Sequence, residues 1–147
     1  YSKLGFKGIG LGDTTGMATP PIVQSVVKYL QDTLPELPIG LHFHNTRGLG
    51  LVNVMAGLDE GIDQFDASFG GIGGCPFAPK ATGNICTEDL VYMLHEMNID
   101  TNIDLQALME IAIQVEAIVG HDLPGQVMKA GPRLDLHSMT SVATAQG

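Results

Sequence analysis

Three times along this chain, a short apolar stretch typical of a β-strand is followed by a region rich in helical spacing or turn residues. The strand patterns cover residues 7–14, 39–44 and 62–71. The first helix is predicted to start with Thr19 as its N-cap and Pro20 at its first position, and a second covers residues 48–61. Such alternation predicts an α/β fold whose parallel strands are joined by right-handed crossovers.

Three strand–helix units are too few to close an eight-stranded barrel. They fit the last three units of a (β/α)8 barrel of the TIM type or part of an open doubly wound sheet, and the pattern leaves both open. The chain lacks an initiator Met, and its first residues, YSKLGF, resemble the last turn of a helix. We therefore expect it to be a piece of a longer protein.

Two further helices, over residues 85–98 and 104–119, are predicted after a Gly-rich loop at 70–84. Beyond Gly120 the sequence shows little periodicity, so this tail is expected to fray. The prediction is a partial catalytic domain over residues 1–120, followed by a C-terminal tail over residues 121–147.

Charge and composition exclude several classes of partner. The formal net charge is −9 with only seven Lys and Arg residues, whereas a nucleic-acid partner needs clustered basic side chains. No stretch reaches the roughly 18–20 apolar residues of a membrane span. Two cysteines, Cys75 and Cys86, are too few for a disulfide scaffold and indicate a reducing compartment. Arg47 and Lys80 remain as local cations for an anionic small molecule.

Unusual polar residues follow each predicted strand at its carboxyl end. Asp13 closes the first strand, His42 and His44 close the second, and the loop that contains Cys75 follows the third. Both candidate folds place their active site at the carboxyl ends of parallel strands. These three strand ends therefore predict one shared site.

His42 and His44 are expected to project from the same side of their strand, because residues two apart share a face. Their Cα atoms would lie about 6–7 Å apart, which lets two imidazoles bind one cation. A core polar residue and a helix-cap partner explain the same pair, so the doublet alone leaves both interpretations open.

Asn84, just before a predicted helix, also has two interpretations. Asn is among the best N-cap residues. Its side-chain oxygen is also a hard ligand, which beside two imidazoles suits Mg²⁺ or Mn²⁺. Such a site still needs a carboxylate, for which Asp13 is one candidate and an acidic residue from a preceding part of the protein is the better one.

Cys75 lies between Gly74 and Pro76 in a loop of the kind that opens and closes over active sites. An unperturbed thiol is mostly protonated at neutral pH, so Cys75 is a candidate proton donor to a carbanion. Cys86 has no comparable setting and is interpreted as having no catalytic role. The glycines at 70–74 lack the strand–helix context of a dinucleotide-binding motif.

Four segments, GLGDTTGMATP, LHFHNTRGLGLVNVMAGLDEG, FDASFGGIGGCPFAPKATGN and TEDLVYML, together closely resemble the 3-hydroxy-3-methylglutaryl-CoA lyase family. The resemblance covers about residues 1–120. The related Claisen-type synthases also carry an HxHN strand, but they typically have a GIGERAGN-like loop where this chain has its cysteine loop. That loop favours the lyases over the synthases.

The resemblance implies the C-terminal three βα units of a (β/α)8 barrel, plus an extra helix. It implies that His42, His44 and Asn84 bind a divalent cation, Mg²⁺ or Mn²⁺. Cys75 would be the general acid/base, and Asp13 would lie near the substrate hydroxyl. The implied reaction is a retro-Claisen cleavage, with 3-hydroxy-3-methylglutaryl-CoA giving acetyl-CoA and acetoacetate, as in leucine degradation and ketone-body formation.

The chain departs from the familiar lyases at Asn45 and Arg47. Arg47 and Lys80 are candidate substrate-binding cations, and another 3-hydroxyacyl-CoA such as citramalyl-CoA is an alternative substrate. The Arg-Asp pair that these lyases carry on their first strand is not in this chain, so an inactive barrel piece that keeps metal or CoA binding is a second hypothesis. The resemblance also implies a homodimer when intact, in the cytoplasm or the mitochondrial matrix.

Overall fold

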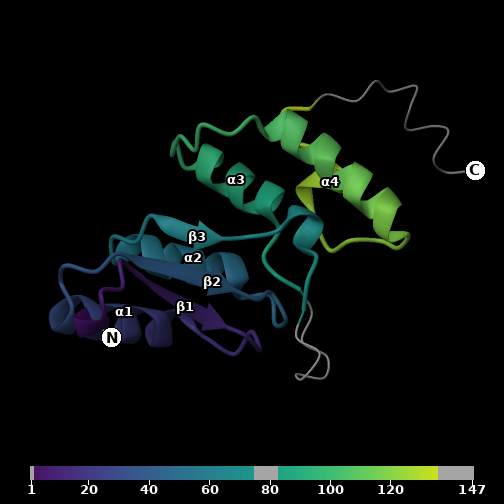
Figure 1. The fold of residues 1–147 in the computed structure, drawn as a ribbon. Helices are drawn as coiled ribbons and strands as arrows, with labels where there is room; N and C mark the ends of the chain where they lie inside the picture. Colours follow the sequence, from purple (N-terminus) through teal and green to yellow (C-terminus); the bar gives the residue numbers. More distant parts are fainter. Residues whose placement is uncertain (1, 75–82, 136–147) are drawn as a thin grey trace, which may run out of the picture.

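The computed structural model describes residues 2–74 and 83–135, which contain a three-stranded sheet and its covering helices (Figure 1). Strands β1 (Ile9–Asp13), β2 (Ile39–Phe43) and β3 (Gln64–Asp66) are all parallel and lie in the order β1-β2-β3. Helix α1 (Pro20–Thr33) connects β1 to β2, and α2 (Gly50–Asp59) connects β2 to β3. The predicted parallel α/β fold is therefore confirmed in these residues, although three strands do not distinguish a barrel from an open sheet.

The predicted helices are present, with slightly different ends. α1 begins after Thr19, as predicted. α2 is shorter than the predicted 48–61, because Gly48 (φ 72°) and Gly61 (φ 79°) have left-handed backbone angles that a helix does not accept. The helices predicted at 85–98 and 104–119 are α3 (Thr87–Glu96) and α4 (Leu105–Val119), each slightly shorter than predicted. No helix in residues 2–74 and 83–135 is long and apolar enough to cross a membrane.

The two faces of the sheet have different environments because side chains alternate along each strand. On one face, Ile39, Leu41 and Phe43 of β2 are buried in the main core together with residues of α1, α2 and α3. The other face carries His42 of β2 and Asp66 of β3, and neither side chain belongs to that core. The sheet therefore has one packed face and one open face.

The segment 121–135, predicted as part of a C-terminal tail, packs against α4. It contains the short helix α5 (Val127–Ala130), and Leu123 (2% exposed) packs with Ala112 of α4 and Met128 in a second apolar cluster. Figure 1 shows this segment folding back against α4. A four-residue helix is too short to give a periodic pattern, which is why the sequence did not reveal it.

We predict that Leu123→Ala lowers the free energy of unfolding by about 2–5 kcal/mol, the usual cost of emptying a buried leucine site. Leu134→Ala is the matched control, because Leu134 lies in the same segment and is 78% exposed. Chemical denaturation measures both variants. Equal stability of the two would contradict the packing described for residues 121–135.

Glu88 of α3 is a fully buried carboxylate that ties α3 to the glycines after β3. Its Oε2 accepts a hydrogen bond from the backbone N–H of Gly70 at 3.0 Å, in the 3-10 turn η2 (Phe69–Gly71). Burial raises the pKa of Glu88 above its ordinary value, and the backbone N–H groups of Glu88 and Gly70 partly oppose that shift. Glu88 therefore fixes the start of the Gly-rich loop through this hydrogen bond. Burying the carboxyl lowers the free energy of unfolding more once it ionises.

We predict that Glu88→Gln becomes more stable relative to the original chain as pH rises from acid to neutral. A raised pKa means that the stabilising contribution is complete at low pH and is lost as pH rises through the folded-state pKa. Gln keeps an oxygen for the Gly70 N–H and never ionises. Glu88→Ala also removes that acceptor, so it is expected to be less stable than Glu88→Gln by about 1–3 kcal/mol at any pH. Urea denaturation measures the free energy of unfolding of each variant across this pH range. A difference between Glu88→Gln and the original chain that stayed constant with pH would refute the account.

Candidate functional site

His42 and His44 lie at the carboxyl end of β2 with their rings close together. The ring centroids are 5.2 Å apart and the ring planes are inclined by 55°. His44 is buried, and its Nδ1 has no hydrogen-bond partner among the described residues. Phe43, between them, lies in the main core on the opposite face, as the strand pattern predicts. The pair therefore presents two imidazoles at the open face of the sheet.

Asn84 lies directly against His44, because the two residues form an isolated antiparallel β-bridge. The Asn84 Nδ2 donates to the backbone oxygen of Ile72 at 2.9 Å, which fixes the orientation of the amide. Its Oδ1 is buried and has no hydrogen-bond partner among residues 2–74 and 83–135. The alternative role as an N-cap is wrong, because the N-cap of α3 is Cys86.

The segment before α3 is held across the ends of β2 and β3 by backbone hydrogen bonds. Asn45 N donates to Gly83 O, and Ile85 N donates to Phe43 O, each at 3.1 Å. On the other side, Ser68 N donates to Ile85 O at 3.2 Å. These bonds place Asn84 beside the histidines although about forty residues separate them in the sequence.

These residues fit a hard divalent cation. A buried polar atom without a partner is costly, and here both His44 Nδ1 and Asn84 Oδ1 are of that kind. The amide oxygen is a hard ligand of the kind that Mg²⁺ and Mn²⁺ prefer, and imidazole nitrogen is the commonest metal ligand in proteins. The described residues contain no group of three or more His, Cys, Asp or Glu side chains that could hold a metal, so any carboxylate ligand must come from elsewhere.

Asp13 lies at the rim but on the other side of the sheet from His42. Its partner in the β1–β2 register is Phe43, and Gly12 is the residue paired with His42. The Asp13 carboxylate accepts hydrogen bonds from the backbone N–H groups of Met17 (2.8 Å) and Ala18 (3.2 Å). The structure therefore gives Asp13 a role in shaping the β1–α1 turn, and its predicted role near a substrate hydroxyl stays a prediction.

Arg47 joins the two loops that follow β1 and β2. Its Nη1 donates to the backbone oxygens of Thr15 (3.0 Å) and Gly16 (3.1 Å). Asn45, the other departure from the familiar lyases, accepts a hydrogen bond from Gly50 N through its Oδ1 at 3.0 Å, at the start of α2. Both side chains therefore bind backbone groups of the rim, and substrate binding by Arg47 stays a prediction.

Of the two cysteines, only Cys86 lies within the described residues, and the predicted site residues Cys75 and Lys80 lie outside them. Cys86 is buried. Burial, with the nearby carboxylates of Asp89 and Glu88, raises the pKa of its thiol far above the ordinary value. A buried, protonated thiol agrees with the interpretation that Cys86 has no catalytic role.

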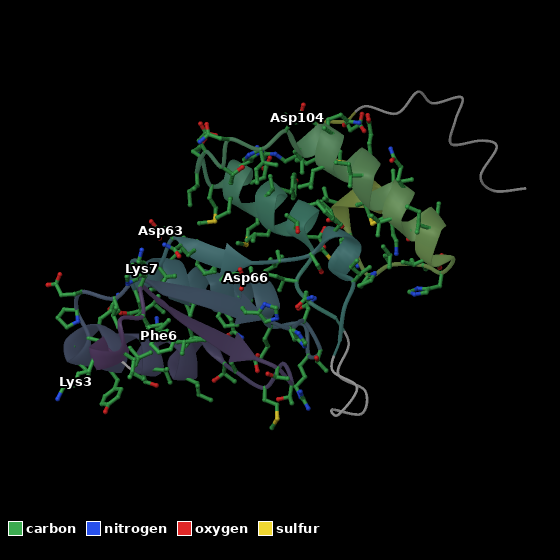
Figure 2. The ribbon with its side chains drawn as sticks, in the orientation of Figure 1. Lys3, Phe6, Lys7, Asp63, Asp66 and Asp104 are labelled. Carbon is green, nitrogen blue, oxygen red and sulfur yellow. The ribbon has the colours of Figure 1, made fainter. Side chains whose placement is uncertain are left out.

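Asp66 is a polar residue of this site that the sequence analysis did not single out. It is the last residue of β3, and its Oδ2 lies 3.7 Å from His42 Nδ1. Figure 2 labels it at the opposite end of β3 from Asp63. The strand predicted over 62–71 places Asp66 in its middle, whereas β3 ends at Asp66, so its position at the rim was not evident from the sequence.

Comparison with known proteins identifies the family of this chain. The family model described as HMGL-like matches residues 1–115. The chain is 46% identical over 129 residues to an (R)-citramalyl-CoA lyase of Chloroflexus aurantiacus, covering 88% of this chain and 41% of that protein. It is 45% identical over 124 residues to the hydroxymethylglutaryl-CoA lyase YngG of Bacillus subtilis, covering 84% of this chain and 42% of that protein.

A solved structure of an HMG-CoA lyase from Acinetobacter baumannii, in complex with coenzyme A and 3-methylmalate, has the same fold over this region. It is 54% identical with a TM-score of 0.89, covering 95% of this chain and 46% of that chain. The chain thus spans less than half the length of the relatives it matches. Since the family model covers most of its length, the chain belongs to the HMGL-like family.

Proposed function

We propose that the protein containing this chain is a carbon–carbon lyase that cleaves a 3-hydroxyacyl-CoA in a retro-Claisen reaction dependent on Mg²⁺ or Mn²⁺. The observation that carries the proposal is a pair of buried atoms, His44 Nδ1 and Asn84 Oδ1, which lie beside His42 and have no hydrogen-bond partner within residues 2–74 and 83–135. A cation bound at this strand end would explain why three side chains with metal-binding atoms lie together there. Relatives named as lyases of this substrate class support the reaction.

In this proposal His42, His44 and Asn84 hold the cation, which when bound polarises the substrate oxygens and lowers the pKa of its hydroxyl. A base removes the hydroxyl proton, the C2–C3 bond breaks, and its electron pair passes to the thioester as an enolate. The Cys75 thiol then gives its proton to that enolate carbon. The oxygen that lost its proton becomes the carbonyl of the second product, so atoms and charge balance.

We infer that the rest of the protein completes a (β/α)8 barrel around the open edge of β1. An apolar groove of about 380 Å³ lies between β1 and α1 and is lined by Leu11, Val26 and Phe43 among others. Ile22 and Val26 of α1 remain 50% and 41% exposed there. A preceding strand–helix unit would cover these side chains, and an earlier strand would supply the carboxylate ligand and the arginine that the resemblance implies.

The substrate within this class is proposed as 3-hydroxy-3-methylglutaryl-CoA, with citramalyl-CoA as the alternative. The relatives matched at 45–46% identity carry one name of each kind, so likeness alone does not choose. The homodimer, the substrate-binding roles of Arg47 and Lys80, and the cytoplasmic or mitochondrial location stay predictions.

We predict that the complete natural protein containing these 147 residues binds Mn²⁺ or Mg²⁺, measured by isothermal titration calorimetry. His42→Ala, His44→Ala and Asn84→Ala are each expected to weaken binding by more than the roughly 10–100-fold typical of residues that only support a ligand. His95→Ala is the control, because His95 lies on α3 and hydrogen-bonds to Thr101 in the loop that follows this helix. Binding of equal strength in all four variants would refute the metal centre.

We predict that the same protein cleaves one member of a small panel of 3-hydroxyacyl-CoA thioesters, measured by release of the acyl-CoA product. Cys75→Ser is expected to lower kcat by roughly 10²–10⁴-fold with metal affinity unchanged, because it replaces the proton donor only. Cys86→Ser is the matched control and should retain activity. Metal binding without turnover of any thioester would favour the second hypothesis, an inactive protein that keeps the cation site.

A further inference from the structure

His42 is paired with a different residue on each neighbouring strand, and only one of these two residues has a side chain. In the pairing of the three strands, Gly12 of β1 lies opposite His42 on one side, and Asp66 of β3 lies opposite it on the other. In-register residues of neighbouring strands project to the same face. The His42 ring therefore has a carboxylate on the β3 side and a residue without a side chain on the β1 side.

The contact between His42 and Asp66 involves one particular nitrogen of the imidazole ring. The Asp66 Oδ2 lies 3.7 Å from Nδ1 of His42, so the carboxylate faces Nδ1 and leaves Nε2 available for a ligand. That distance exceeds a hydrogen bond, and the Asp66 side chain is 81% exposed, so neighbouring side chains do not hold the carboxylate at this distance. Figure 2 labels Asp66 at the carboxyl end of β3, the end at which the predicted site lies.

Asp66 does not act as the missing carboxylate ligand. The described residues contain no group of three His, Cys, Asp or Glu side chains placed to share one ion, although His42, His44 and Asp66 are near one another. Asp66 approaches the ring from the Nδ1 side only. A histidine that binds a metal through one nitrogen usually donates its other N–H to a carboxylate, which fixes its tautomer and orientation.

We propose that Asp66 is a positioning residue that accepts the Nδ1–H of His42 and thereby directs the Nε2 lone pair to the divalent cation. This inference rests on the proposed function, since it takes His42 as a metal ligand. The exposed position limits what this pair contributes to folding, because solvent screens it.

The test compares Asp66→Ala, Asp66→Asn and Asp63→Ala in the complete natural protein. Asp63 is a matched control, since it is an exposed aspartate at the other end of β3. We expect Asp66→Ala to weaken Mn²⁺ binding about 10–100-fold by calorimetry. Asp66→Asn keeps an oxygen that accepts the Nδ1–H, so it should recover most of that loss. Asp63→Ala should bind as tightly as the original protein.

A second measurement needs no metal. Long-range ¹H–¹⁵N spectra of the metal-free protein, recorded where the imidazoles are neutral, report which nitrogen of His42 carries the proton. We expect the Nδ1–H tautomer in the original protein and in Asp66→Asn, and a mixture in Asp66→Ala. The three variants should have the same melting temperature. Equal stability would show that a change in the tautomer or in metal binding comes from the orientation of His42 and not from damage to the fold.

Two results would overturn different claims. If the original protein binds Mn²⁺ and Asp66→Ala binds it equally tightly with the same tautomer, the positioning role is wrong and the metal centre stands. If the original protein binds no divalent cation, the proposed function itself fails and the positioning role fails with it.

Discussion

The parallel register of β1, β2 and β3 decides which side chains of this chain can meet. Because side chains alternate between faces, a one-residue shift of β2 would move His42 and His44 into the core and bring Phe43 to the open face. Leu41 and Phe43, buried against the helices, oppose that shift. The apolar core therefore fixes the position of the two histidines even though it contains neither of their rings.

The second constraint is the segment 83–87, which runs between the ends of β2 and β3. Its backbone donates to Phe43 O and accepts from Asn45 and Ser68, as a short additional strand would. Asn84 reaches His44 through this pairing, and the Asn84 amide is then held by Ile72 O. Glu88, one turn further on, anchors the first part of the same loop through Gly70 N. The site thus depends on backbone bonds between loops as much as on the strands.

The sequence predicted the parallel α/β order, the start of α1 and the shared face of His42 and His44, because these follow from local spacing and helix chemistry. The sequence left Asn84 open between an N-cap and a ligand beside the histidines, since the choice depends on where segment 83–87 pairs. It also missed Asp66, whose importance appears only once β3 lies in register beside His42. The packing of residues 121–135 was missed because a single turn of helix has no period.

Asn45 and Arg47, where the chain departs from the familiar lyases, both form hydrogen bonds to the backbone of the rim. Asn45 accepts from Gly50 N and Arg47 donates to Thr15 O and Gly16 O, so both connect the loops after β1 and β2. Gly16, with φ 61°, leaves no room for a side chain beside Thr46, which brings those loops into close contact. An arginine held by two backbone carbonyls is oriented before any ligand arrives, so it loses less freedom on binding an anion than an unrestrained cation does. These two positions therefore set the shape of the rim that the loops after β1 and β2 form.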